Sequence, residues 1–267
     1  MERILEEFSL KLEKISRFEN GISLLLLCII SLISFNFTNL MNSTYIRDTG
    51  IRNVAMVNNK NSELENITVV IDPGHGGVDP GKIGRNNMPE KDINLGISLK
   101  MKKILKDKGF NAVMTRDKDE GLYEETDSNK KIADMRRRCE LINNEYIRNG
   151  NVICVSIHQN SYPDERVCGP QVFYYSKSRE GSRLAEIMQR TINDKMNVER
   201  PRNTKANDNY FLLINTDCPT VIVECGFLSN PKEAAKLCEK DYQNKIADAV
   251  VEGISRYFSA KTDICNQ

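Results

Sequence analysis

Five short apolar runs, separated by segments of helical periodicity, limit what this chain can fold into more than any other feature. The runs are rich in β-branched residues and cover Ile67–Ile71, Ala112–Thr115, Val152–Ile157, Gln171–Tyr175 and Thr220–Val223. In Val152–Ile157 both faces of an extended strand would be apolar, which is typical of a central strand covered on two sides. We therefore expect a sheet with helices on both faces.

The segments between these runs predict helices. Apolar residues recur every three or four positions from Ile132 to Tyr146 and again from Leu184 to Met196. Helices are also expected at about 90–108 and 241–258. Because strands that alternate with helices pair in parallel, the sequence predicts an α/β domain with a mostly parallel sheet at 66–260, followed by a tail at 261–267.

Charge and cysteine usage exclude some functions. Lys and Arg number 38 against 37 Asp and Glu, whereas a protein that coats nucleic acid usually has a strong basic excess, so no nucleic-acid partner is expected. The mixed charges of Asp117–Glu140 predict a solvated loop and an outer helix face. The 8 cysteines lack C-x-x-C spacing, and Cys154 and Cys225 fall inside expected strands, so most are expected to be free core thiols.

The N-terminal part has the composition of a membrane anchor. Gly21–Ile46 contains no charged residue, and a spanning helix needs roughly 17–25 apolar residues. Residues 21–41 are therefore expected to form an uncleaved transmembrane signal-anchor. A cleaved signal peptide is the alternative, although the small residues of an A-x-A-like cleavage site are not found, since no Ala precedes Ala55.

The flanks of this anchor set its expected orientation. Lys11, Lys14 and Arg17 favour a cytoplasmic segment at 1–20. The Asn-rich residues 42–65 are expected to form a flexible linker. The domain at 66–260 would then be membrane-anchored and extracytoplasmic.

Polar residues follow the apolar runs at three strand ends, where active residues collect in open α/β sheets. They are Asp72-Pro-Gly-His75 after the first run, Ser156-Ile-His158-Gln-Asn160 after the third, and Glu224-Cys-Gly-Phe after the fifth. The chain has only 2 histidines, and both lie in these segments. This placement predicts a pair of metal-binding imidazoles.

A hydrolytic zinc site takes three protein ligands and leaves one position open for water. Glu90, which opens an expected helix fifteen residues after His75, is a candidate third ligand, although a role at the helix N-terminus explains it equally well. Asp72 is another candidate, but the turn Asp-Pro-Gly accounts for it more simply. Gly74 and the glycines after His75 give the backbone the freedom to bring the imidazole to a metal.

Glu224 has no evident structural task. An ionised carboxylate at the end of a buried strand is costly unless it has a partner or a function. Beside a metal-bound water it can accept a proton and pass it to a leaving amine. Cys225 as a nucleophile is the alternative, but strand alternation sends its side chain to the opposite face, and no third histidine is present to activate it.

The segments VIDPGHGGVDPG, PEKDINL, SIHQNS and VECGFLSNP, in this order, resemble the zinc-dependent N-acetylmuramoyl-L-alanine amidases of the amidase-3 family. The resemblance implies that His75, Glu90 and His158 hold Zn²⁺ and that Glu224 is the catalytic carboxylate. It also implies a mixed, mostly parallel six-stranded sheet flanked by helices. Such enzymes hydrolyse the amide between the lactyl group of muramic acid and the L-Ala that begins the stem peptide of peptidoglycan.

Substrate contacts are expected at Asn94 and Asn160, which lie in two of these segments. Gln159 departs from the small residue that family members often carry, and would alter the pocket wall without removing a ligand. The alternatives are a zinc peptidase or deacetylase acting on the same wall and an inactive wall-binding module, which the four intact motifs disfavour.

Within the family, EKDINLGISLKMKKIL, MRRRCELIN and ECGFLSNPKEAAKL resemble the germination-specific amidases of spore formers. This implies a role in the spore cortex, where stem-peptide removal precedes formation of muramic-δ-lactam, and a location in the space around the forespore. A general autolysin of the same chemistry is the alternative. Since wall-binding repeats and a helical insertion after SIHQNS are missing, control by expression, by location or by an activating protein in trans is expected.

Overall fold

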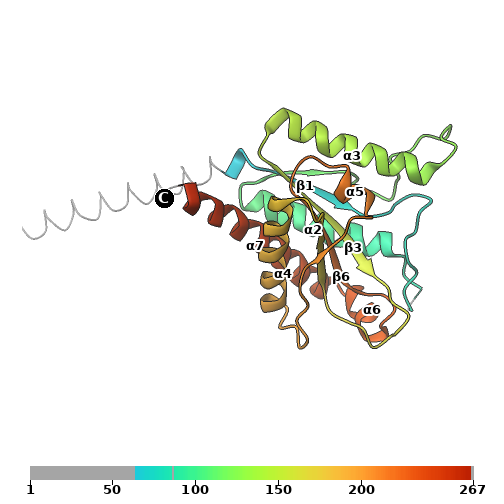
Figure 1. Ribbon diagram of the computed structural model, residues 1–267. Coiled ribbons are helices and arrows are strands. Elements are labelled where there is room, and N and C mark those ends of the chain that lie inside the picture. Colours follow the sequence, from blue (N-terminus) through green and yellow to red (C-terminus); the bar gives the residue numbers. More distant parts are fainter. Residues whose placement is uncertain (1–63, 86, 266–267) are drawn as a thin grey trace, which may run out of the picture. The chain divides into compact units, whose positions relative to one another are not determined.

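The computed structural model describes residues 64–85 and 87–265 (Figure 1). The predicted cytoplasmic segment at 1–20, the signal-anchor at 21–41 and nearly all of the linker at 42–65 lie outside the described residues. Within the part of the chain that is described, no helix combines the length and the apolar character needed to cross a membrane.

Six strands form one mixed sheet in the order β2-β1-β3-β6-β4-β5. The strands are β1 (Thr68–Pro73), β2 (Asn111–Met114), β3 (Val152–Asn160), β4 (Gln171–Tyr174), β5 (Lys205–Ala206) and β6 (Thr220–Phe227). The neighbouring strands β2, β1, β3 and β6 run parallel, with β2 at the edge of the sheet, and β4 pairs antiparallel with β6. The expected mixed, mostly parallel sheet is confirmed, while the short β5 was not expected.

The helices flank this sheet. They are α2 (Glu90–Asp107), α3 (Lys130–Asn149), α4 (Arg179–Lys195), α5 (Phe211–Ile214), α6 (Pro231–Leu237) and α7 (Lys240–Cys265). The helices expected at 90–108, 132–146, 184–196 and 241–258 are confirmed, and α7 continues past 260 into the expected tail. The short α5 and α6 were not expected, although Asn230 followed by Pro231 is a start signal for a helix, and Asn230 Oδ1 accepts from the backbone of α6.

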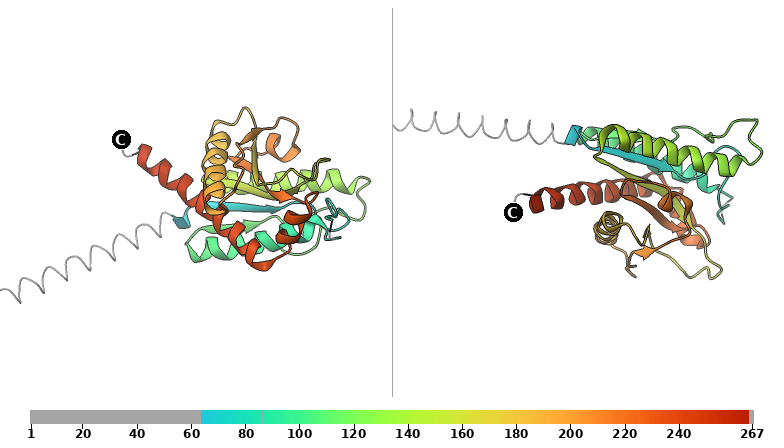
Figure 2. Two further views of the ribbon diagram at one scale, coloured as in Figure 1. Left: turned by 90° about the horizontal axis from the view of Figure 1, so that it is seen from below. Right: turned by 45° about the horizontal axis from the view of Figure 1, so that its top comes forward.

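Both faces of the sheet are covered because its central strands are apolar on both sides. Val69 and Ile71 of β1 belong to a core formed with α2, α4 and α7. Val70 of β1 and Cys154 of β3 face the other way, into a core with α3 and α5. Figures 1 and 2 show α3 on one side of the sheet and α7 on the other. Because β1, β3 and β6 are parallel neighbours, the loops that follow them lie together at the carboxyl-terminal end of the sheet.

Of the six cysteines whose side chains the structure describes, four pack in the core as expected, and Cys168 and Cys238 are partly exposed. Cys139, Cys154, Cys218 and Cys225 are buried, and none of them is in a disulfide. A core of this size needs no covalent cross-link.

Candidate metal centre and its cavity

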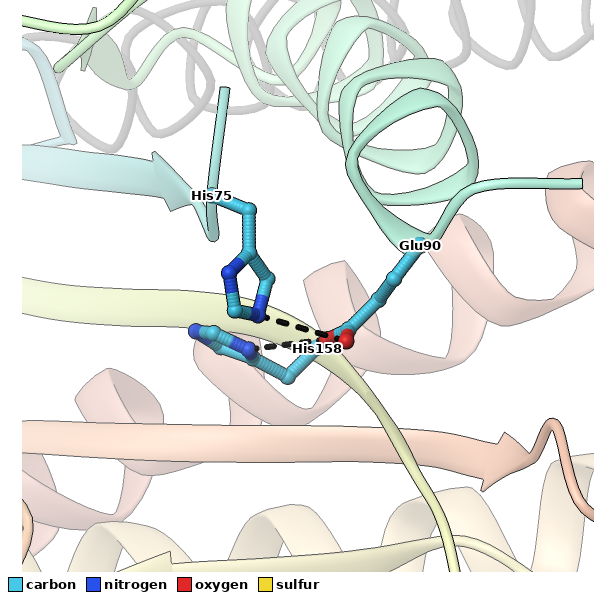
Figure 3. A group of neighbouring side chains, drawn as sticks. All are labelled: His75, Glu90 and His158. Carbon is cyan, nitrogen blue, oxygen red and sulfur yellow. Dashed lines mark hydrogen bonds and ion pairs between the residues drawn. The ribbon is translucent and has the colours of Figure 1, made fainter. Parts of the chain in front are cut away.

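Three side chains from three elements converge at the carboxyl ends of β1 and β3 (Figure 3). His75 lies in the loop after β1, His158 lies on β3, and Glu90 is the first residue of α2. Glu90 Oε2 is 3.2 Å from His75 Nε2, and Glu90 Oε1 is 3.0 Å from His158 Nδ1. One ligand atom from each residue lies within 4.8 Å of the others. Two imidazoles and one carboxylate are a known ligand set of hydrolytic zinc, so these residues fit that metal.

Two glycines leave the space that the imidazoles and the carboxylate occupy. A Cβ on Gly74 would lie 2.2 Å from Cε1 and Nε2 of His158. A Cβ on Gly81 would lie 2.6 Å from Glu90 Oε2 and 2.7 Å from His75 Cδ2. His75 itself has a φ of 62°, a left-handed conformation that a side-chain-bearing residue keeps only when its surroundings hold it there.

Asp79 orients the His75 ring. Asp79 Oδ2 is 2.8 Å from His75 Nδ1, which leaves Nε2 facing Glu90. Burial raises the pKa of Asp79, but the hydrogen bond and charge of His75 outweigh it and lower that pKa. A carboxylate on the second ring nitrogen is how proteins fix the tautomer of a metal-binding histidine. The sequence analysis did not single out Asp79, although it lies only four residues after His75.

Glu90 is held in place by backbone amides. Its Oε2 accepts from Lys82 N at 2.9 Å, and its Oε1 accepts from Gln159 N at 3.0 Å. Burial raises the pKa of Glu90, but the hydrogen bonds and charges of His158 and His75 outweigh it and hold that pKa well below its usual range. Glu90 is therefore ionised, as a metal ligand must be. Because its carboxylate faces the two imidazoles, this geometry favours a ligand role over a role at the helix N-terminus.

Asp72, the alternative third ligand, has other partners. Its carboxylate accepts from Thr115 Oγ1 and Ser156 Oγ, both at 2.6 Å, and from Arg138 Nη1 at 2.7 Å. Burial raises the pKa of Asp72, but the charge of Arg138 and these hydrogen bonds lower it to about 2. Asp72 therefore shapes the turn before His75, which is the simpler of the two roles expected from the sequence.

Two buried arginines hold the backbone of the loop that carries His75. Arg138 of α3 is 1% exposed and donates to Pro73 O at 2.8 Å and to His75 O at 2.6 Å. Arg116 donates to Pro73 O and Gly74 O, both at 3.0 Å. The expectation that Asp117–Glu140 is a solvated stretch is therefore wrong at Arg138, because its side chain is drawn to the buried Asp72 carboxylate and the loop carbonyls.

Asn94 supports the same loop. It is fully buried, its Nδ2 donates to Gly74 O at 3.1 Å, and its Oδ1 accepts from Gln159 Nε2 at 3.1 Å. In this structure the buried Asn94 side chain has no exposed surface, and its expected contact with substrate stays a prediction. Asn160 lines the cavity beside the centre and is partly exposed, so its contact with substrate stays a prediction.

The cavity lined by His75, Glu90 and His158 has a volume of about 580 Å³, and Glu224 of β6 also lines it. Glu224 is 7% exposed, and its Oε2 has no hydrogen-bond partner among the described residues. Burial raises the pKa of Glu224 to about 7, although the charge of His158 opposes the shift. A carboxylate that lines a cavity and whose pKa is raised to about 7 can accept a proton near neutral pH.

Cys225, the alternative nucleophile, lies on the other face of β6. Its side chain is part of the core formed with α4 and α7, and burial raises the pKa of its thiol. A thiol in that state is inert as a nucleophile, so the geometry leaves Glu224 as the reactive side chain of this strand.

Comparison with known proteins supports a single family. A family model described as N-acetylmuramoyl-L-alanine amidase matches residues 69–256. The germination-specific N-acetylmuramoyl-L-alanine amidase of Bacillus subtilis (strain 168) is 36% identical over 199 residues, which cover 73% of this chain and 81% of that protein. The amidase AmiA of Escherichia coli (strain K12) is 26% identical, with 71% of this chain and 75% of that protein covered.

Solved structures share the fold. The CwlD amidase from Clostridioides difficile, determined in complex with the GerS lipoprotein, matches with a TM-score of 0.68 and 34% sequence identity. That match covers 73% of this chain and 99% of the CwlD chain. An N-acetylmuramoyl-L-alanine amidase from Clostridium difficile 630 matches with a TM-score of 0.64 and 32% identity, over 74% of this chain and 99% of that one.

Proposed function

This chain belongs to the amidase-3 family of N-acetylmuramoyl-L-alanine amidases, and from that membership we propose that it hydrolyses peptidoglycan with zinc bound by His75, Glu90 and His158. The bond cut is the amide between the lactyl group of N-acetylmuramic acid and L-Ala. The observation that carries the proposal is the convergence of both histidines and Glu90 beside the unpartnered oxygen of Glu224.

The residues divide the chemistry among them. Zinc at this centre would supply a bound water with a pKa near 7 and polarise the scissile carbonyl. The Glu224 carboxylate accepts the proton of the attacking water and delivers it to the leaving nitrogen of L-Ala. Asp79 keeps His75 Nε2 directed at the centre, and the buried partners of Glu90 keep that carboxylate ionised.

Mass spectrometry of peptidoglycan incubated with the zinc-loaded protein tests this proposal. We expect released stem peptides with a free L-Ala amine and glycan with free lactyl carboxyl groups. A chelator should abolish both, and added zinc should restore them. Cleavage inside the stem peptide would indicate a peptidase instead, and loss of acetyl groups would indicate a deacetylase.

We propose further that the enzyme acts on the spore cortex. The 36% sequence identity with the germination-specific amidase of Bacillus subtilis (strain 168) supports this role. Stem-peptide removal would free the lactyl carboxyl groups that later close to muramic-δ-lactam. Spores of a deletion strain should lack the lactam and germinate poorly, and a Glu224→Gln copy should fail to restore it. Normal lactam content in the deletion strain would indicate a general autolysin.

A membrane anchor at 21–41 and an activating partner remain part of the proposal. The uncharged composition of that segment supports the anchor, and the CwlD structure determined with the GerS lipoprotein supports a protein partner. The full chain should resist extraction from membranes by alkaline carbonate and face the extracytoplasmic side, around the forespore in a sporulating cell. Recovery of the full chain in the soluble fraction would argue against the anchor.

A further inference from the structure

A second groove lies beside the catalytic cavity, on the loops that follow β1, β3 and β6. We call it the loop groove; it has a volume of about 510 Å³ and its lining includes Ile83, Ser161, Tyr162, Pro163, Leu228 and Ser229. Ser161 lines both the loop groove and the catalytic cavity. A chain-like substrate held at the metal centre can therefore continue into the loop groove.

Hydrogen bonds tie the walls of the loop groove together. Tyr162 N donates to Ser229 Oγ at 3.0 Å, which joins the loop after β3 to the loop after β6. Leu228 N donates to Asn160 O at 2.8 Å. The two loops thus present a preformed surface, and such surfaces bind with little ordering cost.

The surface of the loop groove combines polar and apolar groups and carries no net charge. Tyr162 and Ile83 are 56% and 55% exposed, so both residues offer apolar surface to a ligand in the groove. The charged residues of the lining are Arg85 and Glu165, and they form an ion pair with each other. The loop groove therefore offers an aromatic ring and an aliphatic side chain, with serine hydroxyls nearby and no unpaired charge in its lining.

Peptidoglycan has two parts that could enter such a groove. The stem peptide carries carboxylates, which would find no free cation in the lining. The glycan strand consists of N-acetylated sugars, whose C–H faces pack on aromatic rings and whose hydroxyl and acetamido groups bond to polar side chains. We propose that the loop groove binds the glycan strand next to the muramic acid whose amide is cut. This inference rests on the proposed function, because it assumes that the scissile amide lies at the metal centre.

Paired substrates test the subsite in the zinc-loaded protein. One is N-acetylmuramoyl-peptide, and the other is a tetrasaccharide that carries the same peptide. In Tyr162→Ala we expect the ratio of KM for the long substrate to KM for the short one to rise roughly 3- to 10-fold, the loss typical of one aromatic packing contact. Tyr162→Phe, which keeps the ring, should retain the ratio of the native protein. Ile147→Ala is the matched surface control, because Ile147 is 77% exposed on α3 and lines neither cavity.

An unchanged ratio of the two KM values in Tyr162→Ala would overturn the subsite. If both KM values rose by the same factor, Tyr162 would contact the peptide or the metal centre instead of the glycan. If the native protein released no peptide from either substrate, the proposed function itself would fail. Titration of the protein with tri-N-acetylchitotriose, which carries no peptide, measures glycan binding separately from catalysis. Shifts of the backbone amide signals of Ser161, Tyr162, Leu228 and Ser229 are expected, and their absence would contradict the proposal.

Discussion

At the scale of single residues, the candidate metal centre depends on the space that Gly74 and Gly81 leave because they have no side chain. The His158 ring fills the position that a Cβ on Gly74 would occupy, and the Glu90 carboxylate fills the corresponding position beside Gly81. Around them, Asp79 and Arg138 hold His75 from its ring and from its backbone carbonyl. Small changes at positions that never touch a metal should therefore change metal binding.

Gly74→Ala tests this dependence. The new methyl group would lie 2.2 Å from the His158 imidazole, so the ring must move and zinc content should fall from about one per chain to near zero while the far-UV circular dichroism stays native. Gly226→Ala is the control, because the nearest atoms to its Cβ are side-chain atoms at 3.3 Å. Full zinc content in Gly74→Ala would contradict this account of the centre.

Substitutions of the two carboxylates of the site, Glu224 and Glu90, should have different effects on zinc content and on activity. Glu224→Gln should keep zinc and lose hydrolysis by about 10²–10⁴-fold, because a proton-transfer group is removed and no ligand is lost. Glu90→Ala, His75→Ala and His158→Ala should instead lose zinc, measured by plasma mass spectrometry of the purified protein. Near-normal turnover in Glu224→Gln would show that another group moves the proton.

At the scale of elements, α3 stabilises the loop that follows β1. Arg138 reaches from this helix to Asp72, Pro73 and His75, and Asp134 one turn earlier accepts from Arg138 Nε at 2.6 Å. The arginine is thus satisfied on both sides, which explains how a cation can be 1% exposed. The helix cannot leave the sheet without exposing two buried charges of opposite sign.

Arg138→Met should lower the free energy of unfolding by about 3–5 kcal/mol, because the buried Asp72 carboxylate loses its compensating charge. Urea denaturation measures this change. Arg148→Ala on the same helix, where the side chain is 69% exposed, should change the free energy by no more than about 0.5 kcal/mol. Equal values for the two variants would mean that the Asp72–Arg138 pair contributes nothing to stability.

At the scale of the whole molecule, the end of the sheet that carries the site also contains buried charged residues, among them Asp72 and Arg138. The pKa of Asp72 is lowered from 3.8 to about 2 in the folded chain. A group whose pKa is depressed by folding stabilises the fold above its unfolded pKa, and that contribution is lost as the pH falls through the folded pKa. For Asp72 the contribution is about 2 kcal/mol and is lost between about pH 4 and pH 2.

Urea denaturation of the metal-free protein between pH 6 and pH 2 checks this dependence. The native protein should lose stability through that window, and Asp72→Asn, which starts less stable, should show a shallower decline. A parallel decline in both proteins would assign the acid sensitivity to other carboxylates.

Zinc should stabilise the whole fold if the centre binds it. A ligand that binds only the folded state, at a free concentration of 100 times its Kd, adds about 2.7 kcal/mol to the free energy of unfolding. We expect the Tm of the metal-free protein to rise when zinc is added and the Tm of His158→Ala to stay unchanged. A rise of equal size in His158→Ala would place the zinc elsewhere.

The sequence by itself determined the layers of the sheet and singled out the candidate site residues. Apolar runs such as Val152–Ile157 bury both faces of a strand wherever they lie, and helical periodicity is a property of neighbouring residues, so both can be read locally. His75, His158 and Glu224 were found because polar residues at the ends of buried strands are costly without a task. Four ordered motifs then singled out the family.

Only the tertiary structure decided how those side chains are held. Arg138 meets Asp72 across 66 residues of sequence, and within a stretch of mixed charges nothing distinguishes it from Arg136 or Arg137. Asn94 was expected at the substrate, and its side chain is buried under the Gly74 carbonyl. The physical reason is that burial and hydrogen bonding depend on which distant segments pack together, whereas strand and helix patterns depend on each residue and its near neighbours.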